Sequence, residues 1–356
     1  MDAVEAMKES IGVSVYEQLE IRFILYIGFG IAVIICNLIC LLVFNSSRDF
    51  RRKFMLYSFV SFAELINGVS FLSAGLGRMQ LLTGGGYNQP ITSSDCIFTF
   101  PWPTLLLISG TLPACANLSL SLERLFAVRY ASTYRGWSNS HKLILIIASV
   151  AVCLILYGLA VMSSLLWPSV SPTRICAVMN SAGPYFGTVH YFLICKAYVI
   201  GFLMVVYVYR FAGSHKKLTS SERRTQRTSL VLLGLCVILV AIPNYVLILD
   251  NWKIPKFPEL LVGIAYCLYA CQSMSTLTVF LLFRPEFRER LLGFLCPFRK
   301  EGRIESSDHV RTVLHSTIER QTRPALAIHT TQIIAKHHQN DPNRRPSAHH
   351  RHNETY

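Results

Sequence analysis

The sequence predicts an all-α polytopic membrane protein, a bundle of seven transmembrane helices followed by a short amphipathic eighth helix. The first observation is composition: residues of the set AVILMFWYC make up 52% of the 356 residues, charged residues only 15%, and the mean hydropathy is +0.40. So few charges cannot coat a soluble globule of this size. The second observation is that seven apolar stretches have the length of about 20 residues that a helix needs to cross a bilayer. An ordinary soluble enzyme is therefore excluded.

The apolar stretches define the expected domain organisation. We expect residues 1–20 to be extracellular, 21–283 to form the seven-helix domain, 284–298 to form an amphipathic juxtamembrane helix, and 299–356 to form a disordered cytoplasmic tail. Prolines interrupt the third stretch, but neighbouring helices and water can satisfy the carbonyl groups that they leave free. The predicted spans cover residues 21–44, 54–76, 98–128, 143–167, 185–211, 228–249 and 260–283.

The distribution of charge predicts the orientation. The formal net charge is +14, and the basic residues gather in alternate connections, at 45–53, 129–142 and 210–227, and in the segment that follows the last span. Residues 1–20 are acidic and lack the apolar core of a cleavable signal, so the first span is expected to act as its own insertion signal. Because Lys and Arg stay in the cytoplasm, we predict a multi-pass plasma-membrane protein with its N-terminus outside and its C-terminus inside. The positive charge therefore does not indicate nucleic-acid binding.

The segment after the last span carries an apolar stripe typical of an interfacial helix on the inner leaflet. Cys296 follows this stripe and is a candidate for lipidation. The remaining tail is polar and rich in His, a composition more typical of disorder than of a dedicated metal site, so no metal or cofactor is predicted. The stripe consists of Phe287, Leu291, Leu292, Phe294 and Leu295.

Cysteine positions predict one disulfide. Of the eleven cysteines, only Cys96 and Cys176 fall in predicted outer segments, and most of the others lie inside spans, where they behave as small apolar residues. Since the outer face is oxidising, these two cysteines can bridge and attach the second outer loop to the third helix. The alternative is that both remain free thiols.

Ionisable side chains inside spans are costly and are therefore functional candidates. Glu64 lies midway along the second span and Lys196 midway along the fifth, and the polar Asn37 and Gln272 can hydrogen-bond in the same interior. Two alternatives stay open: Glu64 is a protonated acid satisfied by Asn37, and Lys196 extends toward an interface instead of contacting a ligand. Two further ionisable residues, Glu123 and Arg124, stand together at the inner end of the third span.

The string Ser121-Leu-Glu-Arg-Leu-Phe-Ala-Val128, at the inner end of the third span, resembles the (Asp/Glu)-Arg-Tyr signature of rhodopsin-like (class A) G-protein-coupled receptors. Departures from the family pattern, including Leu125 in place of Tyr and Ala241 in place of Trp, resemble the large serpentine chemoreceptor families of nematodes. Proline at 101 and 103 leads us to expect an irregularity at the start of the third helix. Further landmarks in register with the family are Asn37, Glu64, Pro243 as the hinge of the sixth helix, residues 283–288, and the pair Cys96 and Cys176.

The resemblance implies a receptor that binds a small molecule from outside and activates a heterotrimeric G protein inside, with an arrestin-like protein as a further partner by analogy. Leu106 stands where amine receptors carry Asp, and Ala270 stands where visual pigments carry Lys, so neither an amine nor retinal is expected. A small apolar or weakly acidic ligand is expected instead. The candidate pocket residues are Leu106, Tyr191, Lys196, Tyr245 and Tyr269.

In resting receptors of this family, the third-helix Arg often pairs with an acid at the base of the sixth helix. Here that region reads Glu222-Arg223-Arg224, and the aligned position is basic. The resemblance therefore implies that Glu123 is the partner of Arg124, and it leads us to expect basal signalling unless Glu222 substitutes.

Other functions are weighed against the receptor. A seven-helix transporter of small solutes is the main alternative, but the sequence shows no repeat between the first and last three helices. A ligand-gated channel is a further alternative. An intramembrane enzyme is not expected, because no catalytic motif of recognisable spacing is present.

Overall fold

The computed structural model describes residues 3–215, 220–252, 254 and 257–295. Seven of its helices are long and apolar enough to cross a membrane, which confirms the predicted all-α, seven-helix architecture of a multi-pass membrane protein. These spans belong to one compact unit that ends at Leu291. The spans cover Val13–Phe44, Met55–Thr83, Pro101–Arg129, Asn139–Leu166, Pro184–Phe211, Glu222–Asp250 and Leu260–Phe283.

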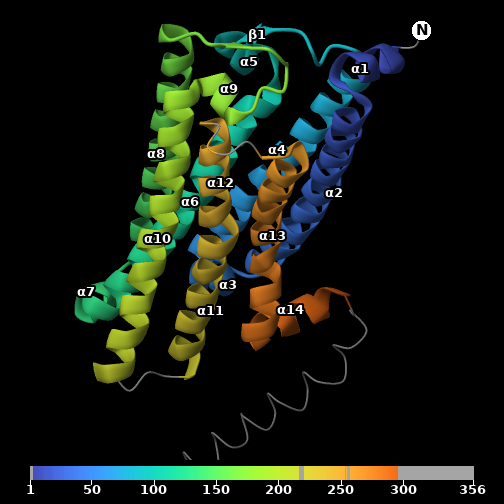
Figure 1. The fold of residues 1–356 in the computed structure, drawn as a ribbon. Helices are drawn as coiled ribbons and strands as arrows, with labels where there is room; N and C mark the ends of the chain where they lie inside the picture. Colours follow the sequence, from blue (N-terminus) through green and yellow to red (C-terminus); the bar gives the residue numbers. More distant parts are fainter. Residues whose placement is uncertain (1–2, 216–219, 253, 255–256, 296–356) are drawn as a thin grey trace, which may run out of the picture. The chain divides into compact units, whose positions relative to one another are not determined.

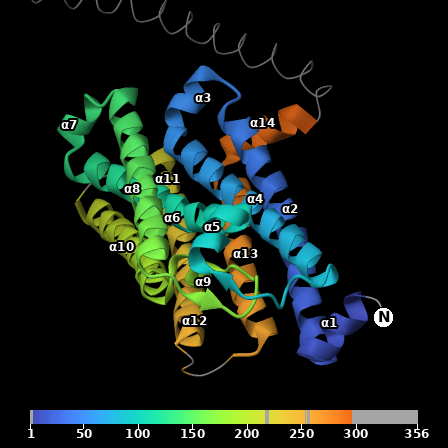
Figure 2. The same ribbon diagram turned by 90° about the horizontal axis from the view of Figure 1, so that it is seen from above.

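The long helices run side by side, and short elements gather at both ends of the bundle (Figures 1 and 2). The disulfide end carries β1 (Ile91–Thr92), α5 (Ser93–Thr99), β2 (Val170–Ser171) and α9 (Val178–Ala182). The two strands pair antiparallel, with Ile91 opposite Ser171. The basic end carries α3 (Arg48–Lys53), α7 (Ala131–Arg135) and the start of α14 (Pro285–Leu295). The helices that make up the spans are α2 (Val13–Phe44), α4 (Met55–Thr83), α6 (Pro101–Arg129), α8 (Asn139–Leu166), α10 (Pro184–His215), α11 (Ser220–Cys236), α12 (Ile242–Asn251) and α13 (Glu259–Phe283).

The helix α2 starts eight residues before the predicted first span, at Val13 instead of residue 21. This extension is amphipathic: Tyr16 and Leu19 are buried, whereas Glu17 is exposed. A search for uninterrupted apolar residues passes over such a pattern, because only one face of the helix contacts the bundle. Residues 3–11 are also helical (α1, Ala3–Ile11), and Met7 is buried against this extension.

The helices α2 and α4 approach closely through small residues. An added Cβ at Gly30 would lie 2.7 Å from the backbone nitrogen of Leu72, and one at Gly68 would lie 3.0 Å from the backbone nitrogen of Ile34. Without side chains at these positions, the two backbones can pack directly against each other, as is common in membrane bundles.

The irregularity expected near the start of the third span is confirmed. The chain extends at Phe100 (φ −116°, ψ 141°), which separates α5 from α6. Pro101 then occupies the first helical position of α6, where its fixed φ and missing N–H cost nothing. As a result, Cys96 lies on α5, a separate short helix before the third span.

The sixth span is not a uniform α-helix. A π-helical turn, η1 (Val237–Ala241), joins α11 to α12, and the buried Pro243 lies two residues after its end. The thiol of Cys195 on α10 donates to the carbonyl oxygen of Ala241, with 3.5 Å between sulfur and oxygen. The residue predicted to be a hinge therefore adjoins a second irregularity that the sequence did not indicate.

Candidate functional site

The first candidate site is a cluster of charges at the basic end of α6. Nη2 of Arg124 lies 3.2 Å from Oε2 of Glu123, so the predicted pairing of these two residues is confirmed. The Glu123 side chain is only 3% exposed, and it also accepts a hydrogen bond of 2.7 Å from the hydroxyl of Tyr134 and lies 3.6 Å from Nζ of Lys142. One buried carboxylate thus joins three helices, α6, α7 and α8.

The position of Tyr134 follows from the local chain path. After α6 ends at Arg129, Tyr130 turns the chain into the five residues of α7, which return Tyr134 toward the last turns of α6. Burial, and next the negative charge of Glu123, raise the pKa of the Tyr134 phenol above its usual value. The phenol therefore remains protonated at neutral pH and acts as a donor to the carboxylate.

Arg124 also contacts groups that the sequence did not single out. Its guanidinium carbon lies 5.6 Å from the ring centre of Tyr57 on α4, a cation–π arrangement. The Tyr57 hydroxyl lies 2.7 Å from the hydroxyl of Ser229 on α11, within hydrogen-bond distance. The Tyr57 ring also packs edge-on against Phe280 of α13, with 5.0 Å between ring centres. Arg124 therefore lies beside a link between α4 and the sixth span.

Glu222 is exposed in the first turn of α11. The ion pair that the structure gives for Arg124 is with Glu123 on its own helix. The acid that holds Arg124 is therefore supplied by the third span itself.

A second site lies in the bundle interior, where the predicted polar residues Asn37, Glu64 and Gln272 are all buried. The Ser273 hydroxyl on α13 joins Glu64 to Asn67, because it donates to Oε2 of Glu64 at 2.6 Å and accepts from Nδ2 of Asn67 at 2.8 Å. The suggestion that Asn37 satisfies Glu64 is wrong, because Nδ2 of Asn37 donates to the backbone carbonyl of Ser273 instead, at 3.1 Å.

Gln272 lies beside Glu64 and also contacts a neighbour on the sixth span. Its Nε2 donates to the sulfur of Cys236 on α11 at 3.2 Å, one residue before the π-helical turn begins. The interior network therefore connects α2, α4 and α13, while Gln272 connects α13 to the sixth span. The sequence alone does not place Ser273 and Asn67 in this network, because their position depends on the rotation of each helix about its axis.

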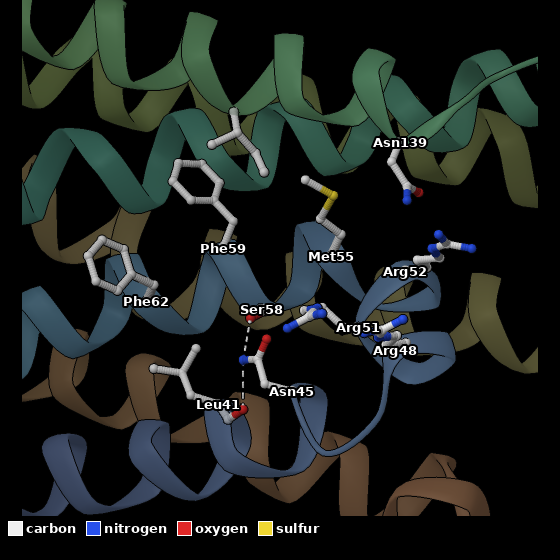
Figure 3. Close-up of a pocket in the computed structure, with 11 residues that line it drawn as sticks. Leu41, Asn45, Arg48, Arg51, Arg52, Met55, Ser58, Phe59, Phe62 and Asn139 are labelled. Atoms are coloured by element: carbon white, nitrogen blue, oxygen red, sulfur yellow. Dashed lines mark hydrogen bonds between the residues drawn. The ribbon is translucent and has the colours of Figure 1, made fainter.

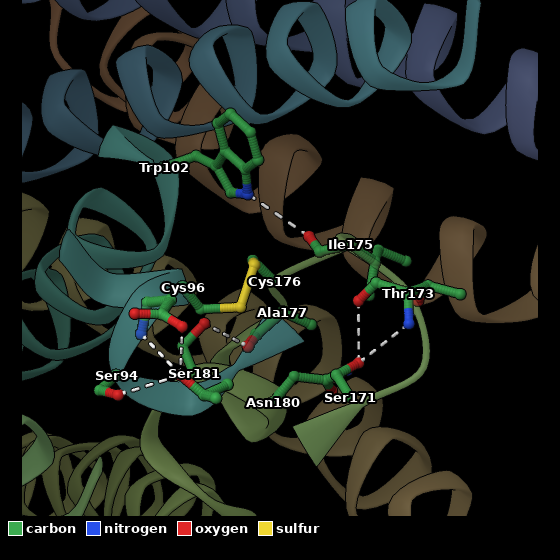
Figure 4. The surroundings of a disulfide bond; sticks show 12 residues. Ser94, Cys96, Trp102, Ser171, Thr173, Ile175, Cys176, Ala177, Asn180 and Ser181 are labelled. Carbon is green, nitrogen blue, oxygen red and sulfur yellow. Dashed lines mark hydrogen bonds between the residues drawn. A yellow bond between two sulfur atoms is a disulfide. The ribbon is translucent and has the colours of Figure 1, made fainter. Parts of the chain in front are cut away.

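The predicted disulfide between Cys96 and Cys176 is present, and both residues are fully buried (Figure 4). The loop that carries Cys176 is also held by hydrogen bonds. Nε1 of Trp102 donates to the carbonyl of Ile175 at 3.4 Å, as Figure 4 shows. Arg78 donates to the same carbonyl at 2.7 Å and to that of Cys176 at 3.3 Å.

The candidate ligand residues divide into two groups. Tyr191 is buried, and its hydroxyl lies 2.9 Å from that of Tyr266. Tyr269 donates to Oδ1 of Asn244, and Leu106 packs against the same apolar core. These three predicted residues, Leu106, Tyr191 and Tyr269, therefore face the interior between α6, α10 and α13.

Lys196 and Tyr245 do not line that interior, which corrects the prediction. Lys196 is exposed, and its Nζ lies 4.6 Å from the ring centre of Phe192, which is itself exposed. This supports the alternative of a side chain that extends along the outer surface. Tyr245 is 53% exposed because its neighbour Asn244 takes the inward position on α12, and adjacent helical residues point about 100° apart.

Two buried arginines supply positive charge in the half of the bundle nearest the disulfide end. Arg22 and Arg78 are each only 2% exposed. Nε of Arg22 donates to the Tyr26 hydroxyl at 2.8 Å, and its guanidinium carbon lies 5.8 Å from the ring centre of Tyr266. The sequence did not reveal their role, because Arg22 stands near the predicted start of the first span and Arg78 in the predicted connection after the second. Charges at such positions are typical of span boundaries.

His190 on α10 is another residue that the sequence did not single out. It is 3% exposed, and its Nε2 has no hydrogen-bond partner within residues 3–215 or the other described segments. A Cβ at Gly110 of α6 would lie 3.2 Å from this nitrogen. A buried polar atom without a partner is costly, which makes His190 a candidate for contact with a ligand.

Among the described residues, no group of three or more His, Cys, Asp or Glu side chains is placed to hold a metal ion. Cys296 and the His-rich tail lie outside the described residues. In the comparisons with known proteins, no family model and no curated protein matches the chain.

Proposed function

We propose that the chain is a rhodopsin-like G-protein-coupled receptor, chemosensory in type, which binds a small molecule from outside the plasma membrane and activates a heterotrimeric G protein inside. The observation that carries the proposal is the Glu123–Arg124 pair, at the end of the third of seven spans and beside the Tyr57–Ser229 contact to the sixth span. An ionisable pair at this depth costs free energy, and ionisable residues within spans are functional candidates for that reason.

The basic end faces the cytoplasm in this proposal, because Lys and Arg remain on that side of a membrane. The disulfide end then faces outward, where oxidising conditions maintain the Cys96–Cys176 bond. The N-terminus is outside and the tail is cytoplasmic, where an arrestin-like protein is a further partner by analogy.

The buried side chains suggest the chemistry of the ligand. Arg78 places a buried positive charge in the outer half of the bundle, where its guanidinium group donates to the carbonyl groups of Ile175 and Cys176. A ligand with a carboxylate or another weakly acidic group complements this charge. A cationic amine does not, and Leu106 offers it no counter-ion.

Activation requires that the ligand bind one conformation of the bundle more tightly than another. Because Arg124 is held by Glu123 of its own helix, opening of the sixth span does not have to break an ion pair across helices. The Tyr57–Ser229 hydrogen bond is the contact beside Arg124 that outward movement of α11 would break. We therefore expect basal signalling in the absence of ligand.

The test is ligand-dependent nucleotide exchange on a G protein in membranes that contain the full chain, screened with small organic acids. Arg124→Ala is expected to abolish the response while leaving surface expression unchanged. Arg129→Ala is the matched control, because Arg129 is exposed one turn further along the same helix. Solute uptake into vesicles that survives Arg124→Ala, without nucleotide exchange, would instead establish the transporter.

A further inference from the structure

A groove at the basic end opens between α2, α4 and α8, next to α3 (Figure 3). Its volume is about 740 Å³, within the range of sites that hold small molecules. It lies apart from the Glu123–Arg124 pair, neither residue of which lines it. The lining residues that matter for its chemistry are Arg48, Arg51, Arg52, Met55, Phe59 and Phe62.

The groove has a charged zone and an apolar zone. In Figure 3 the three arginines of α3 lie at one end, and Phe59 and Phe62 of α4 lie at the other. Between them, Nδ2 of Asn45 donates to the Ser58 hydroxyl at 3.2 Å and to the Leu41 carbonyl at 2.8 Å. Phe62 is 48% exposed, so the apolar zone is open at the surface of the bundle.

Local sequence explains why the arginines point into the groove. The Ser47 hydroxyl caps α3 by accepting from the backbone N–H of Phe50, and Phe50 is buried against Phe54. With Phe50 turned inward, residues at spacings of three and four share the opposite face of α3. Those residues are Arg48, Arg51 and Arg52, and all three are exposed.

No carboxylate in the described part of the chain pairs with these three guanidinium groups. At this end of the bundle, Glu286 pairs with Lys53, and Glu123 pairs with Arg124 and Lys142. Three neighbouring positive charges repel one another, and an anion between them relieves that repulsion. The guanidinium group is planar and forms paired hydrogen bonds with phosphate oxygens.

We propose that this groove binds an anionic phospholipid of the inner leaflet, with its phosphate on Arg48, Arg51 and Arg52 and an acyl chain along Met55, Phe59 and Phe62. The inner leaflet is the anionic one, and the orientation proposed above places the basic end there. A free phosphate would use only the charged zone, whereas a lipid also covers the exposed aromatic rings. The bound lipid would bridge α4 and α8, since Asn139 and Ile146 of α8 line the other wall.

The test measures binding of a fluorescent long-chain phosphatidylinositol bisphosphate to the purified full chain in phosphatidylcholine vesicles. The triple variant Arg48→Gln, Arg51→Gln, Arg52→Gln is expected to weaken binding by about fivefold for each arginine lost. The matched control removes three exposed arginines from α11 at the same end, Arg223→Gln, Arg224→Gln and Arg227→Gln, and is expected to bind as the unchanged chain does.

The free inositol phosphate headgroup, without acyl chains, is expected not to displace the lipid at equal concentration. Displacement by the free headgroup would show an anion site and overturn the lipid proposal. Equal loss of binding in both triple variants would show that binding depends on overall surface charge and not on this groove, and would also overturn the lipid proposal.

A photoactivatable acyl chain gives a second measurement that needs no variant. On the unchanged protein, crosslinks are expected in the peptides that carry Met55, Phe59 and Phe62. Crosslinks confined to other helices would contradict the proposed position. Neither outcome depends on G-protein coupling, so this proposal and the receptor proposal can fail independently.

Discussion

Replacing Gly30 with Ala should separate α2 from α4 and destabilise the bundle. The new Cβ would lie 2.7 Å from the backbone nitrogen of Leu72 and 3.0 Å from the backbone oxygen of Gly68, whereas ordinary contact begins near 3.4 Å. The helices would have to move apart by 0.7 Å at this point, and no side-chain rotation can relieve the contact, because both neighbours are backbone atoms. Overpacking of this kind costs about 1–3 kcal/mol.

Gly28→Ala is the matched control, because an added Cβ there meets nothing within 4 Å. Both variants share the gain in helix propensity of about 1 kcal/mol, so the difference between them isolates the close contact. Thermal unfolding in detergent should show Gly30→Ala melting at least about 2 °C below Gly28→Ala. Equal melting temperatures, or a higher value for Gly30→Ala, would refute the close approach of these two helices.

Three further predictions test the other sites. Ser273→Ala should lower the free energy of unfolding by about 1–3 kcal/mol, because it leaves a buried acid and a buried amide without their shared partner. Ser275→Ala is the control and should not lower it, because the buried Ser275 hydroxyl has no partner among the described residues. Equal effects of the two variants in thermal unfolding would contradict the network. On the receptor proposal, Glu123→Gln should raise basal nucleotide exchange by removing the charge that holds the neighbouring arginine, and output at or below that of the unchanged chain would count against this role. Cys176→Ser opens a loop of 80 residues and should lower the free energy of unfolding by up to about 4.5 kcal/mol. If the variant and the unchanged protein melt at the same temperature under non-reducing conditions, the bond is ruled out.

The sequence sufficed where a feature depended on composition or on neighbouring residues. Apolar length predicted all seven spans, and compartment chemistry predicted the bond between Cys96 and Cys176. Glu123 and Arg124 are adjacent in the chain, so their pairing did not depend on how helices rotate against each other. The break after α5 followed from the fixed geometry of proline at position 101.

What the sequence could not supply was the rotation of each helix about its axis. Lys196 and Tyr245 lie at depths typical of ligand contacts, but their helices turn them outward. Ser273 carries an ordinary small side chain, and it hydrogen-bonds Glu64 and Asn67 only because its helix turns it toward the second span. Arg22 and Arg78 resemble boundary charges in a hydropathy profile, because the profile does not register that neighbouring helices cover them.

The consecutive π-helical turn and proline in the sixth span have a mechanical consequence. The turn spans Val237–Ala241 and Pro243 follows two residues later, so the regular ladder of backbone hydrogen bonds is interrupted at one level of the membrane. The two half-helices can then tilt independently of each other about this interruption. If the bundle changes conformation as the receptor proposal requires, spin labels attached to α11 and to α12 should therefore report unequal displacements, and distances measured on one half-helix should not be extrapolated to the other.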